Sequence, residues 1–302
     1  MLVRKLLMTA LVLGLCCPAV MGAQTLNSAS GYVQLPDADV QSRGTVDLSA
    51  AYVRSEGTNE LSELFPELEP PMPCDGNGWN VRALGGLWDR FEIGGGYLQI
   101  DKELGDAKAW SVAAKYKVYE NCAKDAAIAV GASYRDWDSN MAVIVSDGYY
   151  EDTLDVELPQ VFSAYLAWDK RWVEADESNW GVKTTIGVMY DRYTSSQQKT
   201  AFPFLVVPPG YPVSRTGVVA ADSFVSPFFG VKLDKGGWNL MAEFKPRLRK
   251  DRFFYAKDIW SVAVGKDFGS SLSAKAGVTN FNLPYTDSDP GFFFDLSYRF
   301  GK

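Results

Sequence analysis

Apolar and polar residues alternate with a period of two along most of the chain, and this pattern predicts β-strands with one apolar face. In the stretch 292–300, apolar residues fill the even positions, whereas Asp295, Ser297 and Arg299 occupy odd positions. Twelve such stretches follow one another, each about 9 to 11 residues long, the length that a tilted strand needs to cross a bilayer. No run of 18 apolar residues follows residue 23, so we expect no membrane-spanning helix.

Aromatic residues gather at or near the ends of the predicted strands. Outer-membrane barrels carry aromatic girdles at both membrane interfaces, whereas a soluble sandwich would concentrate such residues in the middle of its strands. The pattern therefore favours a membrane barrel. The aromatic residues concerned are Tyr52, Trp79, Trp88, Tyr97, Trp110, Tyr134, Trp168, Trp180, Tyr190, Trp238 and Tyr298.

Long or medium links alternate with shorter ones, as extracellular loops alternate with periplasmic turns in membrane barrels. An even strand count also lets an antiparallel sheet close without leaving an unpaired edge in lipid. We therefore predict an all-β fold in which 44–300 form a single closed antiparallel transmembrane β-barrel. About 12 strands are expected, with 10 to 14 left open, and both termini should be periplasmic. The longer links are expected at 55–77, 101–108, 136–158, 192–221, 247–257 and 281–290.

The amino terminus reads as a secretory signal peptide. Arg4 and Lys5 precede the apolar run 6–15, and small residues follow near Gly22 and Ala23, where cleavage is expected. We therefore expect 1–23 to be removed, 24–43 to form a periplasmic segment, and the protein to reside in the bacterial outer membrane.

Composition narrows the possible functions. The chain has 302 residues, a formal net charge of -7, a pI near 4.9 and no histidine. An acidic protein is a poor partner for nucleic acid. The absence of histidine excludes Ser-His-Asp and Cys-His catalysis and His-ligated zinc. No carboxylate spacing indicates a glycosidase, so we expect no enzymatic activity, no catalytic residue, no metal and no cofactor.

Several short motifs carry a family resemblance. They are the segment 31–38 (GYVQLPDA) followed by Gly44, the segments 87–94, 114–117 and 127–131, and the closing 298–300 (YRF). Together they resemble YjbH-type outer-membrane barrels associated with exopolysaccharide, although Gly301 and Lys302 follow the final Phe. The resemblance implies outer-membrane lipid and lipopolysaccharide, the barrel assembly machinery and surface polysaccharide as partners.

The polar face of the predicted strands supplies candidate residues for the lumen. Basic groups exceed acidic ones among them, and a positive water-filled lumen would favour anions. The charges would instead pair across strands if the interior were filled, and both outcomes stay open. The candidates are Arg82, Glu92, Lys115, Lys117, Arg135, Lys183, Lys232, Glu243, Lys245, Lys275, Asp295 and Arg299, together with Asp47.

The link 192–221 contains an apolar, proline-rich stretch. It would either pack on the barrel rim or fold inward, in which case Phe202, Phe204 and Tyr211 would form a constriction. After leader removal only Cys74 and Cys122 remain. The expected topology separates them by a membrane thickness, so we predict two free thiols.

These features indicate a non-enzymatic, porin-like passive channel for small polar or anionic solutes. One alternative is a structural envelope barrel linked to exopolysaccharide export or to the cell surface. The other is a soluble, secreted β-sandwich that binds carbohydrate. The oligomeric state is left open.

Overall fold

The computed structural model describes residues 29–59, 76–102, 105–139, 141–146, 151–156, 160–176, 179–194, 222–246, 258–280 and 286–301. They form fourteen strands, and no helix among them is long and apolar enough to span a membrane. The strands are β1 (Val46–Asn59), β2 (Gly76–Trp88), β3 (Phe91–Lys102), β4 (Gly105–Glu120), β5 (Ala126–Ser139), β6 (Met141–Ser146), β7 (Glu151–Val156), β8 (Gln160–Val173), β9 (Gly181–Thr194), β10 (Asp222–Lys235), β11 (Trp238–Lys245), β12 (Ile259–Phe268), β13 (Leu272–Asn280) and β14 (Thr286–Phe300).

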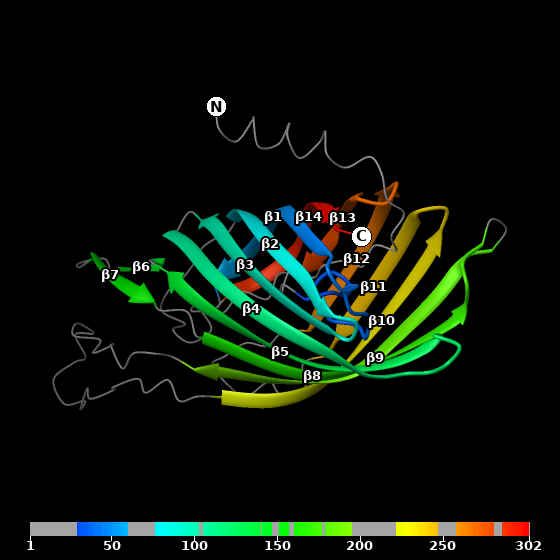
Figure 1. Ribbon diagram of the computed structural model, residues 1–302. Coiled ribbons are helices and arrows are strands. Elements are labelled where there is room, and N and C mark those ends of the chain that lie inside the picture. The colour runs from blue at the N-terminus through cyan, green and yellow to red at the C-terminus, as the bar shows by residue number, and fades with distance from the viewer. Residues whose placement is uncertain are drawn as a thin grey trace.

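Twelve of these strands form a closed antiparallel barrel (Figure 1). Each strand pairs with its neighbour in the chain, except that β5 pairs with β8 across the small separate hairpin β6–β7. The first and last strands close the ring, with Val46 opposite Phe300. The predicted fold and strand number are confirmed, and a closed ring excludes the two-layer sandwich.

The connections between strands lie at the two ends of the barrel, and the two ends differ. The tight connections, such as the Gly236–Gly237 turn between β10 and β11, lie at the same end as the start of β1 and the close of β14. We name this the turn end, and the opposite end the loop end. We predicted a link at 101–108, but the backbones of β3 and β4 stay paired as far as Lys102 and Gly105, so the link is shorter. The prediction ended the strands too early because the sequence turns polar before the backbone pairing ends.

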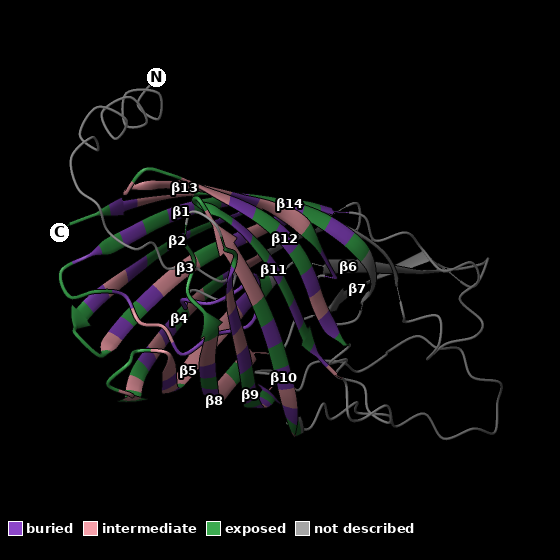
Figure 2. Ribbon diagram, turned by 90° about the vertical axis from the view of Figure 1, so that its right-hand side faces the viewer, coloured by how far each residue is buried: buried purple, intermediate pink, exposed green. Residues whose placement is uncertain are grey.

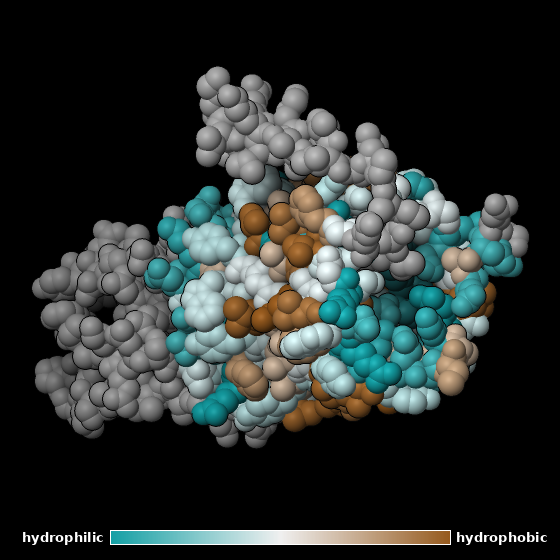
Figure 3. Space-filling model, viewed as in Figure 1, coloured by the Kyte–Doolittle hydropathy of each residue, from teal (hydrophilic) through white to brown (hydrophobic). Residues whose placement is uncertain are grey.

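The outside of the barrel is apolar, and burial alternates residue by residue along the strands (Figure 2). Outward aliphatic side chains such as Val81, Leu166 and Val262 lie between aromatic residues nearer the strand ends. Apolar side chains are also visible on the surface over the strands in Figure 3. Exposed aromatics at the turn end include Trp88, Tyr119, Trp172, Trp180, Trp238 and Phe268, and those toward the loop end include Trp79, Tyr97, Trp110, Phe162 and Phe244.

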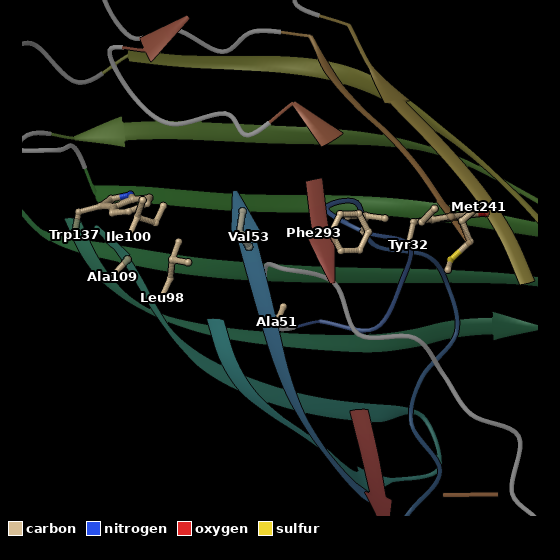
Figure 4. Packing of buried hydrophobic residues seen from close by; sticks show 11 residues of the cluster. Tyr32, Ala51, Val53, Leu98, Ile100, Ala109, Trp137, Met241 and Phe293 are labelled. Atoms are coloured by element: carbon tan, nitrogen blue, oxygen red, sulfur yellow. The ribbon is translucent and has the colours of Figure 1, made fainter. Parts of the chain in front are cut away.

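The inner face changes character along the barrel. Near the turn end it is charged, as at Asp47 and Arg299, whereas toward the loop end Val53, Ile100 and Phe293 are almost fully buried. Figure 4 shows these apolar residues reaching the interior from separate strands, with Tyr32 of the segment that precedes β1 in the same cluster.

That preceding segment lies inside the barrel. Residues 29–43, here named the lumen segment, run within the ring of strands (Figure 1) as far as Gln41 and end at the exposed Ser42 and Arg43. Tyr32, Val33, Leu35 and Ala38 are each at most 2% exposed. We expected 24–43 to lie in the periplasm, but the described part of it occupies the lumen instead. The reason is chemical complementarity, because the polar groups of the segment meet charged side chains of the inner wall.

Candidate functional site: the occupied lumen

The lumen segment folds back on itself at its deepest point. The amide of Tyr32 donates to the carbonyl of Leu35 at 2.9 Å, and Gly31 forms a bridge with Pro36. This tight turn aims three consecutive backbone amides, those of residues 33–35, at the wall.

Glu243 on β11 is the wall residue to which these three amides bind. Its carboxylate accepts hydrogen bonds from the amides of Gln34 at 2.8 Å, Leu35 at 2.9 Å and Val33 at 3.3 Å. Ser261 on β12 donates its hydroxyl to the same carboxylate at 2.6 Å. Successive amides arranged in this way form an anion-binding concavity, so the segment binds a wall carboxylate as it would bind a small anion.

A second anchor forms around Lys183 on β9. Its ammonium lies 2.6 Å from Asp37 and 2.7 Å from Asp39 of the lumen segment, and 3.1 Å from Asp169 of β8. The three carboxylates lie close enough together to suggest a metal site. The Lys183 ammonium, however, contacts all three and supplies the positive charge that an ion would bring. The Lys183 charge beside Asp39 also holds the pKa of that carboxyl below its usual range.

Tyr32 extends this anchor. Its hydroxyl lies 2.7 Å from the Thr185 hydroxyl, which in turn donates to Asp169 at 2.7 Å. Because Thr185 uses its only proton on Asp169, Tyr32 is the donor in the first contact. Burial raises the pKa of the Tyr32 hydroxyl, which keeps that donor proton in place.

The third anchor pairs Lys115 on β4 with Glu92 on β3. Their ion pair measures 3.2 Å, and the Lys115 ammonium also lies 3.3 Å from Asp37. The Glu92 carboxylate accepts hydrogen bonds from the backbone amides of Ser30 at 3.0 Å and Gln41 at 2.8 Å. The two ends of the lumen segment therefore share one wall carboxylate.

Small residues on the wall make room for the segment. A Cβ atom at Gly230 on β10 would lie 2.5 Å from the ring of Tyr32, and one at Gly86 on β2 would lie 2.1 Å from the carbonyl of Ser42. Both distances are too short for a side chain. Glycine at these inward positions is therefore required by the segment and not by the strand itself.

Several wall charges also pair with one another across the barrel. Arg299 on β14 binds Asp47 on β1 through two hydrogen bonds, and Arg82 on β2 lies 2.8 Å from Asp295 on β14. Toward the loop end, Lys245 on β11 pairs with Asp191 on β9. These pairs tie strands that are far apart in the sequence.

The predicted lumen residues lie on the inner face, but their charge balance differs from our expectation. Among the described residues of the wall, six basic and six acidic side chains are buried, so the expected excess of basic groups is absent from the buried set. The predicted candidates omit Asp169 and Asp191, and Asp191 lies directly before the predicted link 192–221. Continuing the alternation from Tyr165 through Ala167 would have placed Asp169 inward. The buried set is Arg82, Lys115, Lys183, Lys245, Lys275 and Arg299 with Asp47, Glu92, Asp169, Asp191, Glu243 and Asp295.

Three other predicted lumen residues, Lys117, Arg135 and Lys232, are only half-buried. Lys117 pairs with Glu120 near the turn end at 2.7 Å. Phe202, Phe204 and Tyr211, the expected constriction, lie outside the described residues, as does Cys74. Cys122 is exposed in the β4–β5 turn and is a free cysteine.

Comparison with known proteins supports the architecture. No family model matches the chain, and no curated protein matches it. The chain is similar to an outer membrane channel from Pseudomonas putida F1, with a TM-score of 0.55 and 12% identity, over 89% of this chain and 100% of that one. It is also similar to the β domain of the Bordetella autotransporter BrkA, with a TM-score of 0.52 and 13% identity, over 84% and 99%. At such identity the likeness shows the outer-membrane barrel fold.

Proposed function

We propose that this protein is a non-enzymatic, porin-like passive channel of the bacterial outer membrane, whose lumen is closed by its own lumen segment. The single observation that carries the proposal is that 29–43 occupy a closed barrel with an apolar exterior. Such an exterior requires lipid around it. The tight turns, the start of β1 and the end of β14 would then face the periplasm. The signal peptide would be removed from the mature protein.

The contacts of the segment support a removable closure. Most of its specific contacts are ion pairs and hydrogen bonds to charged wall groups, such as Lys115, Lys183 and Glu243. Water or a solute can replace partners of this kind. When the segment leaves, it removes the carboxylates of Asp37 and Asp39 from beside Lys115 and Lys183, so the surroundings of these two ammonium groups become more favourable to an entering anion.

Planar-bilayer recording tests this function. The full mature chain should give rare openings, whereas a chain lacking 24–43 should give steady current steps with a reversal potential biased toward anions in a salt gradient. A deletion variant that folds as a barrel and stays silent would contradict the channel. That result would favour the alternative of a structural envelope barrel linked to surface polysaccharide.

A further inference from the structure

A cavity of about 70 Å³ lies beyond the tip of the lumen segment, on the loop side. Its floor includes Gln34 and Leu35 of the tip. Its walls come from the loop ends of several strands, for example Val161 at the start of β8, Tyr193 at the end of β9 and Ile259 at the start of β12. A solute that entered from the loop end would therefore meet this cavity before the segment.

The charged residues that line the cavity are Arg135, Asp191 and Lys245. Lys245 forms an ion pair with Asp191, which also accepts the Ser163 hydroxyl. Counted with Arg135, the lining carries two basic and one acidic side chain, a formal net charge of +1. A small cavity with a formal net positive charge suits a small anion with a single charge.

Trp137 supplies a second donor. Its side chain is 8% exposed, and its indole Nε1 has no hydrogen-bond partner among the described residues. A buried donor without an acceptor is unfavourable, and an incoming oxygen atom would satisfy it. The Arg135 guanidinium carbon lies 5.5 Å from the Trp137 ring centroid, and both residues line the cavity.

The rest of the lining is mixed, with four apolar side chains beside Gln34, three serines and two tyrosines. Leu35, Met189, Val161 and Ile259 lie around the same cavity. We propose that this cavity is a binding site for a small organic monocarboxylate, whose acid group meets Arg135 and Trp137 while a short hydrocarbon body packs against these apolar residues. The inference deepens the proposed function, on which its role in transport rests, by naming a class of solute.

Calorimetric titration of the purified full chain in detergent with butyrate tests the site. Butyramide, which has the same shape without the charge, is the matched ligand control. We expect saturable butyrate binding that is about 10-fold weaker in Arg135→Gln and about 3-fold to 10-fold weaker in Trp137→Phe, which keeps the ring and loses the donor. Arg192→Gln is the matched protein control, because Arg192 lies between two lining residues of β9 but is exposed, and its affinity should not change.

Equal binding of butyrate and butyramide, unchanged affinity in Arg135→Gln, or no saturable butyrate binding up to about 50 mM would each overturn the site. If Arg135→Gln does not fold, Trp137→Phe and the butyramide comparison decide. Binding in detergent does not require conduction. A barrel that conducts without binding butyrate therefore overturns this inference alone, whereas a silent barrel that binds butyrate overturns only the channel.

Discussion

Asp47 and Arg299 lie directly opposite each other on the first and last strands, and the Arg299 guanidinium donates to both carboxylate oxygens, at 2.7 and 2.9 Å. Both side chains are at most 3% exposed. Gln41 of the lumen segment donates to the same carboxylate at 2.6 Å. One buried ion pair therefore joins the strand seam that closes the barrel and also contacts the segment that fills it.

Breaking this pair should destabilise the barrel. In Arg299→Gln, the Asp47 carboxylate stays buried without its cation, which typically costs about 3–5 kcal/mol. We expect a lower urea midpoint for unfolding of the refolded protein in lipid vesicles. Arg192→Gln removes an exposed arginine and should leave the midpoint within error. An unchanged midpoint in Arg299→Gln would show that the seam does not depend on the pair.

The sequence predicts the wall far better than what fills it. Alternation fixes which face Asp295 and Arg299 share, because side chains of a strand point to opposite faces in turn. It does not reveal that Arg82, on a strand that is not paired with β14, lies beside Asp295. That contact depends on the registers of two successive strand pairs and on barrel closure, which no local pattern encodes.

The lumen segment was not predicted for a similar reason. Residues 31–38 show no alternation, so we interpreted them only through their family resemblance. The informative signals come from residues that are far apart in the sequence. The acidic Asp37 and Asp39 are complementary in charge to the inward Lys115 and Lys183. Gly230 leaves space for the ring of Tyr32. Such complementarity becomes visible only after the wall has been folded.

Replacing Glu243 should release the tip of the segment. In Glu243→Gln, one side-chain oxygen remains to accept, and the new amide group faces backbone donors. The loss should weaken docking by about 1.5–3 kcal/mol, the range for hydrogen bonds to charged groups. Hydrogen-exchange mass spectrometry should show faster exchange in the peptide covering 29–43. Equal exchange rates in the two proteins would rule out Glu243 as the anchor.

Adding a methyl group at Gly230 should displace Tyr32. The new Cβ atom would lie 2.5 Å from the ring, so Gly230→Ala should speed hydrogen exchange in the segment and raise the open probability in bilayers. Gly95→Ala is the matched control, because its Cβ atom would have only one neighbour, the Ser111 carbonyl oxygen at 3.5 Å.

A second change separates this clash from damage to the strand. Adding Tyr32→Ala to Gly230→Ala removes the ring with which the new methyl group would clash. The double variant should then behave like Tyr32→Ala alone. A double variant that shows the two effects simply added together would contradict a direct clash.

The contribution of Asp39 should depend on pH with a defined sign. Lys183 lowers the pKa of Asp39, so ionised Asp39 favours docking above its ordinary pKa of about 4. That contribution is lost as the pH falls below this value through the lowered pKa. Hydrogen exchange at 29–43, corrected for its intrinsic rate, should therefore differ between the wild type and Asp39→Asn near neutral pH. The two should converge in strong acid, and a difference that grows with acidification would contradict this sign.

Cys122 offers a direct test of orientation. It is exposed in the β4–β5 turn, at the turn end, which we propose faces the periplasm. In a Cys74→Ser background, a membrane-impermeant maleimide should leave Cys122 unlabelled in intact cells and label it after the outer membrane is permeabilised. Replacing the exposed Asp138, near the loop end of β5, with cysteine in a Cys122→Ser, Cys74→Ser chain gives the control, which should react in intact cells. The reverse pattern would show that the barrel is inserted with the opposite orientation.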